Sequence, residues 1–338
     1  MIARWWGVAF LSLALCPQET AASPHPKRPH PHRRARPAPA TFDATAVNDP
    51  ATRPVVAPGS AGSGVLRAEI LLSRAHFSCG EIDGHYGQNL RGAIRAFQES
   101  RGLEQGGVVN KRTWDALNAD IAPALVTAAI APEDVAGPFT PVPDDMLEKA
   151  KLPRLGYSSP LEAIAEKYHS SPKLLEKLNP NGAFDQAGTQ ILVPNAATDP
   201  PGKAAKVVVS KSRRTVEALD ADGKILASYP ASIGSEHDPL PLGQWKIRGV
   251  AHDPVFHYNP DLFWDARENE KAAVPPGPNN PVGVCWIDLS KPHYGIHGTA
   301  EPAQIGKTQS HGCIRLTNWD VSELSQMVKP GTPAVLTD

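Results

Sequence analysis

The 338-residue sequence lacks several features that mark particular classes of protein. It has only four cysteines, and one of them lies in an apolar N-terminal run, so the rest of the chain can form at most one internal disulfide. Neither sign of charge dominates, with 34 basic against 35 acidic side chains, which excludes a polybasic nucleic-acid binder. No apolar run reaches the roughly 20 residues that a transmembrane anchor needs. Length and 41% hydrophobic residues instead predict two or three domains with buried cores.

The N-terminal residues 1–22 predict a secretory signal peptide. A short basic region with Arg4 precedes an apolar run of about twelve residues, and the small residues Thr20 and Ala22 follow at the positions of a cleavage site. A lipoprotein site at Cys16 is the alternative, but Leu15 is bulky where a small residue is expected. We therefore expect an exported protein.

Proline is abundant, with 35 residues, and much of it falls in residues 23–64 together with Ala, His and Arg. This stretch carries six basic against two acidic side chains and has little apolar surface to bury. We expect a disordered linker here, preceding the first domain.

Residues 65–120 predict a small helical domain. Two segments show helical periodicity, a turn signal Ile82–Gly87 separates them, and Thr113–Leu117 begins a third helix. The motifs "iDGxyG", "AxxxFQ" at Ala93–Gln98, "GL" and "TWxxL" together resemble the peptidoglycan-binding domain type 1 family. This resemblance implies that peptidoglycan is a partner.

A Pro- and Ala-rich connector is expected over residues 121–156, with a short helix near 144–151. Residues 157–196 then predict two helices and a strand at Gln190–Val193. "LxxIAxxY", "LLxxLNP" and "aGTQILVP" resemble LysM, a glycan-binding module, although Ser159-Pro160 replaces the early Gly-Asp of the usual pattern. A structural segment without sugar binding stays open as the alternative.

Residues 204–338 predict a mostly β domain with a C-terminal helix. The expected strands are 207–209, 215–219, 225–229, 245–250, 284–289 and 334–336, and the helix contains Val321, Leu324 and Val328. Thr317 or Asn318 is its expected N-cap. The whole chain is thus expected to be a multidomain α+β protein.

The densest group of reactive side chains lies in Tyr294–Thr299 and Ser310–Leu316. A cysteine attacks as its thiolate, and a nearby imidazole can accept its proton, so Cys313 with a neighbouring histidine is a candidate nucleophile and base. A turn at Gly312 would expose backbone N–H groups that could hold an oxyanion.

Three other interpretations of this group stay open. A zinc site could use His293, His297, His311 and Cys313, although Pro292 and Gly295 make a helix improbable there. Cys313 could also be a buried structural residue, or it could form a disulfide with Cys285 or Cys79.

"YGIHGTxxxxxIGxxxSHGCIRL" resembles the signature of the YkuD family of L,D-transpeptidases, and the loop Pro275–Gly283 matches "PPGPNNPLG" of its ErfK/YbiS/YnhG branch. The resemblance implies a β-sandwich-like catalytic domain. It also implies roles for nine residues: Cys313 as nucleophile, His297 as general base, Gly298 and Thr299 as groups that orient the base, Gly312 at the oxyanion turn, and Arg315, Ser310, His311 and Tyr294 in substrate binding.

The family mechanism implies that the thiol attacks the third residue of a peptidoglycan stem tetrapeptide, releases D-Ala and forms a thioester. An amine of another stem would then give a cross-link, a protein lysine would attach that protein to the wall, and water would make the enzyme a carboxypeptidase. No metal or cofactor is expected, and the location would be the periplasm or cell wall. A non-catalytic peptidoglycan-binding scaffold and a zinc peptidase are the rival interpretations.

Overall fold

The computed structural model describes residues 42–196, 198–264 and 266–338. The predicted signal peptide and the basic part of the predicted linker lie outside this range. All described residues belong to one compact unit. None of the helices in these described ranges is long and apolar enough to cross a membrane.

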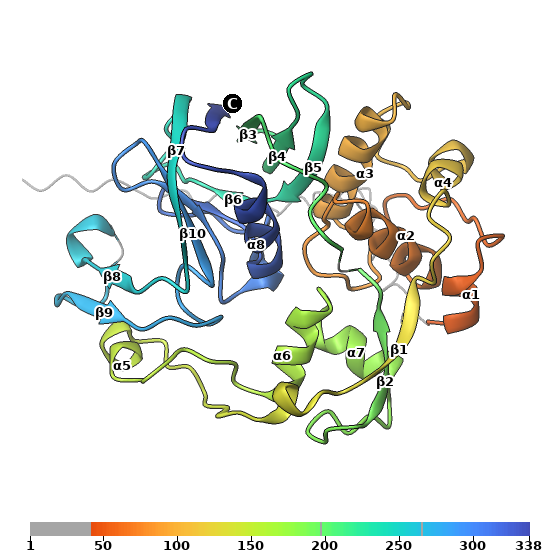
Figure 1. The fold of residues 1–338 in the computed structure, drawn as a ribbon, viewed down its shortest axis with the longest axis horizontal. Helices are drawn as coiled ribbons and strands as arrows, with labels where there is room; N and C mark the ends of the chain where they lie inside the picture. Colours follow the sequence, from red (N-terminus) through yellow and green to blue (C-terminus); the bar gives the residue numbers. More distant parts are fainter. Residues whose placement is uncertain (1–41, 197, 265) are drawn as a thin grey trace, which may run out of the picture. The chain divides into compact units, whose positions relative to one another are not determined.

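The first domain is helical, as predicted (Figure 1). Its helices are α1 (Ala44–Asn48), α2 (Ser63–Arg74), α3 (Gln88–Ser100) and α4 (Lys111–Leu117). Apolar residues spaced three and four apart place Leu66, Ile70 and Phe97 in one core, where each is at most 1% exposed. Trp114 of α4 closes this core and donates its indole N–H to the carbonyl of Pro54.

The prediction of a disordered linker up to residue 64 is wrong for residues 42–64. Asp43 caps α1 by accepting hydrogen bonds from the amides of Thr45 and Ala46, and Val47 is fully buried against α2. Val56 is 1% exposed and forms a β-bridge with Val109. A few apolar residues separated by Pro and Gly therefore suffice to order this segment, because the helical domain supplies the surface that covers them.

A small α/β layer follows the helical domain. Its elements are β1 (Leu125–Ala129), a 3-10 turn η1 (Pro132–Val135), α5 (Met146–Ala150), α6 (Pro160–Lys167), α7 (Pro172–Leu178) and β2 (Gln190–Pro194). The predicted helices and the predicted strand at β2 are present. The segment 121–156 is more than a connector, however, because β1 pairs antiparallel with β2 along five residues. The alanines of β1 have low β-propensity, so only its partner reveals it as a strand. The likeness of this layer to LysM stays a prediction.

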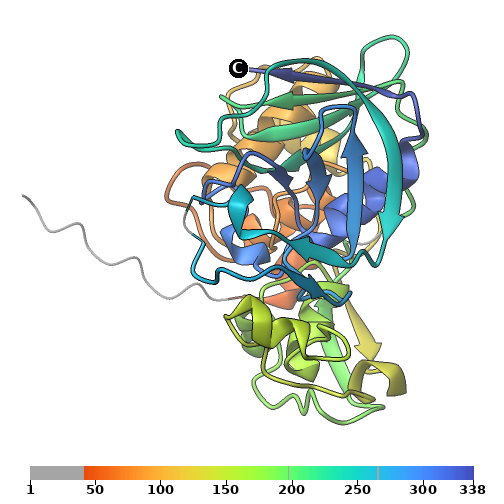
Figure 2. The ribbon, with the colours of Figure 1, turned by 90° about the vertical axis from the view of Figure 1, so that its left-hand side faces the viewer.

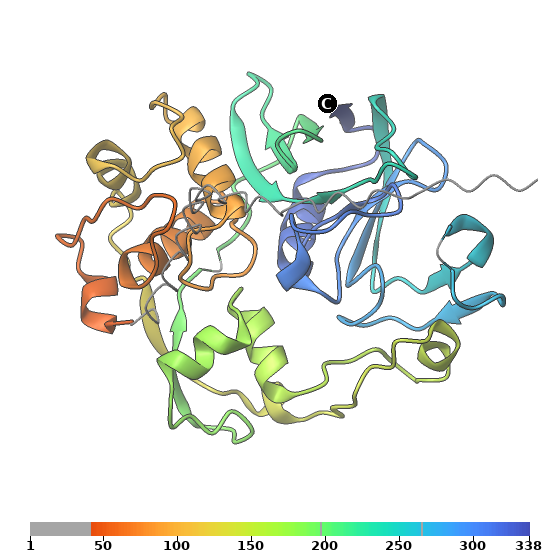
Figure 3. The same ribbon diagram turned by 180° about the vertical axis from the view of Figure 1, so that it is seen from behind.

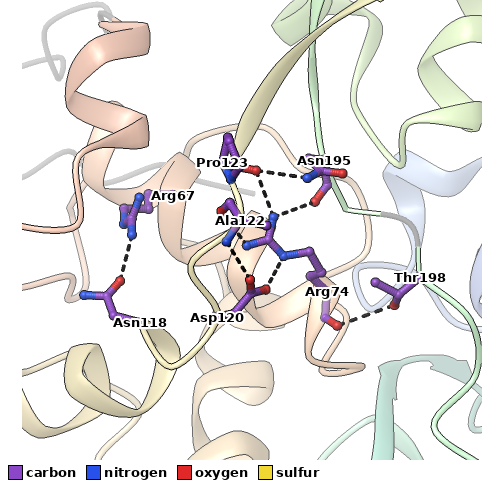
Figure 4. Close-up of polar contacts among 8 residues, drawn as sticks. All are labelled: Arg67, Arg74, Asn118, Asp120, Ala122, Pro123, Asn195 and Thr198. Carbon is purple, nitrogen blue, oxygen red and sulfur yellow. Dashed lines mark hydrogen bonds and ion pairs between the residues drawn. The ribbon is translucent and has the colours of Figure 1, made fainter.

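A buried arginine ties α2 to both ends of this layer (Figure 4). The guanidinium of Arg74 donates to the carbonyls of Ala122 and Pro123, each at 2.9 Å, and to that of Asn195 at 3.3 Å, and it forms an ion pair with Asp120. Its side chain is 6% exposed. One planar cation thus satisfies three carbonyl oxygens that no regular element pairs at this junction.

The C-terminal domain is built on a nine-stranded sheet with the order β5-β4-β3-β13-β7-β10-β11-β12-β6. Its strands are β3 (Lys206–Ser210), β4 (Thr215–Leu219), β5 (Ile225–Pro230), β6 (Ser232–Ile233), β7 (Gly243–His252), β10 (Cys285–Leu289), β11 (Gly295–His297), β12 (Ile314–Arg315) and β13 (Pro333–Thr337). The ten-residue β7 pairs with β13 through residues 243–246 and with β10 through residues 247–252. It thereby joins two halves of the sheet, which Figure 2 shows from the side of β7.

One helix, α8 (Asn318–Met327), packs on β10 and β11 (Figure 3). Thr317 is its N-cap, as predicted, and accepts the amide of Asp320. Val321 and Leu324 are fully buried in the core of this domain. The multidomain α+β class, with a mostly β domain that carries a helix close to its C-terminus, is confirmed.

Candidate active site

The candidate nucleophile and base lie on neighbouring strands. β11 and β12 are parallel, and their register places His297 opposite Arg315 and Ile296 opposite Ile314. Cys313 immediately precedes β12. Both Cys313 and His297 line one cavity of about 1000 Å³, together with Arg315 and the predicted substrate-binding residues Tyr294 and His311. Two segments sixteen residues apart in sequence thus present thiol, imidazole and guanidinium to the same space.

Cys313 is half-buried and its Sγ lies 3.6 Å from the carbonyl oxygen of His293. Burial raises the pKa of the thiol, while a backbone hydrogen bond at Gly295 and the charge of Arg315 act in the opposite direction. The free site therefore holds a thiol, not a thiolate, at neutral pH. A base is needed when the sulfur attacks.

The turn before the cysteine depends on Gly312 and Ser310. Gly312 has φ of 92°, and a Cβ there would lie 2.8 Å from the ring of Tyr294, so a side chain is excluded on both grounds. Ser310 is 3% exposed, accepts the amide of Gly234 at 2.7 Å and donates to the carbonyl of Cys313. The hydroxyl of Ser310 faces the protein and holds the turn, and Ser310 does not line the cavity.

His297 is 4% exposed and its orientation is defined by the next residue. Its Nδ1 lies 2.7 Å from the carbonyl oxygen of Gly298. A carbonyl only accepts, so Nδ1 carries the hydrogen and Nε2 is the proton acceptor of the neutral ring. The indole of Trp286 stacks on the imidazole with ring centroids 5.4 Å apart. Burial, and next the charge of Arg315, lower the pKa of His297 to about 3, so the ring is neutral at physiological pH.

Of the two residues predicted to orient the base, only Gly298 makes a recorded hydrogen bond with the imidazole. Thr299 is buried, but its amide donates to Oδ1 of Asn318 at 3.1 Å and its hydroxyl accepts the amide of Glu301 at 3.1 Å. Thr299 thus acts on the backbone that follows the histidine.

An aromatic cover, made of Phe263 and Trp264, lies on the segment between β8 (Phe256–Tyr258) and β9 (Ala272–Val274), and its Phe263 is one of the residues that line the cavity. The ring of Phe263 meets that of His311 edge to face at 5.0 Å, and Trp264 lies 6.0 Å from the same imidazole. Trp264 is 61% exposed and is not among the residues that line the cavity. Helix α5 packs against β9 (Figure 1), which joins the segment 121–156 to this cover.

The alternative interpretations of the cysteines find no matching geometry in the described ranges. Cys79, Cys285 and Cys313 are all free thiols. No three His, Cys, Asp or Glu side chains among the described residues are grouped so that they could hold a metal ion.

Sequence reasoning missed four residues around this site: Trp286, Phe263, Trp264 and, apart from its possible role as a cap, Asn318. The stacking of Trp286 on His297 depends on the pairing of β10 with β11, and no local motif announces it. The loop Pro275–Gly283, by contrast, was identified from its sequence motif. Both of its asparagines are buried and hydrogen-bonded.

Two families match parts of the chain. The YkuD family, described as "L,D-transpeptidase catalytic domain", matches residues 204–336, and the family described as "Putative peptidoglycan binding domain" matches residues 61–117. The chain is 33% identical over 179 residues to the "Putative L,D-transpeptidase YkuD" of Bacillus licheniformis, which covers 52% of this chain and 93% of that protein. It is 27% identical over 188 residues to the "Probable L,D-transpeptidase ErfK/SrfK" of Escherichia coli, covering 54% and 60% of the two chains.

Among solved structures, an L,D-transpeptidase (residues 123–326) from Xylanimonas cellulosilytica aligns with 82% of this chain and 95% of its own. The sequence identity is 17% and the TM-score is 0.36.

Proposed function

The chain belongs to the YkuD family of L,D-transpeptidases, and from that premise we propose that it transfers peptidoglycan stem peptides through a thioester on Cys313. The observation that carries this proposal is the meeting of Cys313 and His297 in one cavity, with Nε2 of the imidazole left as acceptor by the bond from Nδ1 to Gly298. Cys313 is the one cysteine among the described residues that line this cavity.

In the proposed reaction, Sγ of Cys313 attacks the carbonyl carbon of the third residue of a tetrapeptide stem, and its proton passes to Nε2 of His297. Backbone N–H groups at the Gly312–Cys313 turn would stabilise the oxyanion. When the intermediate collapses, the bond to the terminal D-Ala breaks, and its amine leaves with the proton from His297. A thioester remains on Cys313.

The second half of the proposed reaction is attack by an amine on the thioester, with its proton returning to Cys313 through His297. Arg315 is charged and opens into the cavity beside both reacting groups, which suits a stem carboxylate. An acceptor amine on another stem gives a cross-link between two third residues, and an amine on a protein attaches that protein to the wall. The helical domain would raise the local concentration of the polymer.

This chemistry places the enzyme where its polymer is, in the periplasm or cell wall. The peptidoglycan-binding domain and the family membership both support an exported location.

The test is mass spectrometry of purified residues 23–338 incubated with disaccharide-tetrapeptide, with Cys313→Ala as the matched control. Loss of D-Ala together with a new dimer in the wild type alone is the expected result. Loss of D-Ala without a dimer would point to the carboxypeptidase or to a missing protein acceptor. No reaction, with Cys313 inert to a carbapenem, would overturn the proposal in favour of a scaffold.

A further inference from the structure

Asn318 is the first residue of α8, and its buried side chain contacts the backbone that follows the candidate base. Both its side-chain oxygen and its side-chain nitrogen form hydrogen bonds. Asn318 is 2% exposed. Oδ1 accepts the amides of Val284 at 3.2 Å and Thr299 at 3.1 Å, and Nδ2 donates to the carbonyl of Pro278 at 3.0 Å. Because two amides can only donate, the assignment of oxygen and nitrogen in this side chain is unambiguous.

The oxygen of Asn318 also sets how closely two backbone segments approach. A Cβ at Gly298 would lie 2.2 Å from Oδ1, and one at Gly283 would lie 2.1 Å from it. The amide of Gly298 donates to the carbonyl of Cys285, and its own carbonyl accepts from His297. Asn318 therefore fixes the peptide units whose carbonyl orients the imidazole.

The remaining partner of Asn318 comes from outside the catalytic domain. Nδ2 lies 3.0 Å from Oε1 and 3.2 Å from Oε2 of Glu166, which sits near the end of α6. The hydroxyl of Tyr157 donates to the same carboxyl at 3.0 Å, which fixes it from the other side. Helix α6 lies beside α8, so a residue 152 positions earlier in the chain holds the asparagine in place.

We propose that Glu166 and Asn318 are positioning residues of the active site, which hold the Gly298–Thr299 backbone and through it the ring of His297. The proposal deepens the proposed function, since it rests on His297 as the base. Helix α6 would then help to position the catalytic base. The segment that resembles a glycan-binding module would thus also support the active site of the domain that follows it.

Glu162 offers a matched control on the same helix. Its carboxyl also bonds to the catalytic domain, accepting Nδ2 of Asn279 at 2.8 Å, but no recorded hydrogen bond links it to Asn318 or the Gly298–Thr299 backbone. Loss of either carboxylate loosens the docking of α6. Only loss of Glu166 releases the backbone after His297.

The experiment compares Glu166→Ala, Glu166→Gln and Glu162→Ala in the protein that keeps residues 23–338, by steady-state kinetics of D-Ala release and by NMR of ¹⁵N-labelled histidine. In Glu166→Ala we expect kcat to fall by about 10- to 100-fold, because small displacements of a base are costly, with KM within about twofold. Glu166→Gln keeps one acceptor oxygen and should recover most of the rate. Glu162→Ala should stay within about twofold of the wild type in both constants.

The NMR signal of the Nδ1–H of His297, assigned with a His297→Gln sample, reports the position of the ring directly. It should shift in Glu166→Ala and stay unchanged in Glu162→Ala. Equal effects of the two substitutions on kcat and on this signal would overturn the positioning role. If the wild type releases no D-Ala, the proposed function fails, and the NMR comparison alone then supports or overturns the positioning pair. If Glu166→Ala does not fold, Glu166→Leu, which keeps the side-chain volume but has no acceptor oxygen, takes its place, and an unchanged shift and rate in that variant count against the proposal.

Discussion

Gly298 occupies a position where no side chain fits, because Oδ1 of Asn318 lies in the place of its Cβ. Gly298→Ala should therefore lower the free energy of unfolding by about 1–3 kcal/mol, the usual cost of overpacking, and reduce kcat through displacement of His297. Urea unfolding and the rate of D-Ala release measure the two effects. Gly92→Ala in α3, where a Cβ meets no atom within 4 Å, is the control and should not destabilise. Equal behaviour of the two variants would contradict the steric argument.

Cys313 and His297 should behave as a neutral pair in the free enzyme, because burial raises the pKa of the thiol and lowers that of the imidazole to about 3. We expect the rate of alkylation of Cys313 by iodoacetamide to rise about tenfold per pH unit from pH 6 to 9, following the thiolate fraction. The Cys313→Ala variant corrects for Cys79 and Cys285, both buried. A rate that is flat between pH 5 and 8 would show a preformed ion pair and contradict this expectation.

Single residues were predictable where a local motif contains them. Cys313, His297 and Gly312 stand within about twenty residues of one another, so the sequence itself suggests their chemistry. Asn318 and Glu166 are separated by 152 positions, and their contact exists only once α6 and α8 have packed. Such pairs leave no local pattern in one sequence.

At the scale of elements, the strands β3, β4 and β5 were predictable because each is a run of β-branched or apolar residues bounded by turn residues. The third helix of the first domain was also expected, but its cap is Asn110, which accepts the amide of Thr113. β1 and the pair β8 and β9 were not predicted. β1 and β9 each contain two alanines, which have low β-propensity, and β8 is only three residues long.

Arg74 joins three segments, so Arg74→Met should destabilise the protein by roughly 3 kcal/mol. The substitution leaves the carbonyls of Ala122, Pro123 and Asn195 without their shared donor and Asp120 without its counter-ion. Urea unfolding followed by circular dichroism measures the loss. Arg112→Met, on an exposed face of α4, is the control and should change stability by less than about 0.5 kcal/mol. If Arg74→Met changed the stability by a similarly small amount, water molecules would be replacing the guanidinium as donors to these carbonyls.

At the scale of the whole molecule, buried carboxyls gather where the domains meet. Burial raises the pKa of Glu81 of the helical domain, Glu166 of α6 and Asp320 of α8 to about 7 in each case. Asp320 accepts the hydroxyl of Ser78 across the contact between the first and last domains, with Thr317 and Glu323 as its other neighbours. A carboxyl with a raised pKa stabilises the folded protein most when protonated. Its contribution is therefore present below pH 4 and is lost as the pH rises through about 7.

The variant Asp320→Asn should remove this dependence. Between pH 5 and 7, the stability of the wild type should fall relative to the variant by about 1 kcal/mol per pH unit, since the folded protein keeps a proton that the unfolded chain has lost. Urea unfolding at half-unit steps of pH provides the measurement. Asp222→Asn lies in an exposed turn, and the pH dependence of its stability should match that of the wild type. If the stability of Asp320→Asn also had the same pH dependence as that of the wild type, Asp320 would be ionised in the folded protein throughout this range.

β13 lies in the middle of the nine-stranded sheet, between β3 and β7, although it is the last strand of the chain. During synthesis, β3, β7 and the reactive Cys313 leave the ribosome before β13, which pairs with both β3 and β7, has been made. The sheet that carries the thiol is therefore complete only when residues 333–337 have inserted between β3 and β7. Translation order thus delays the completion of this sheet until the last strand of the domain has been made.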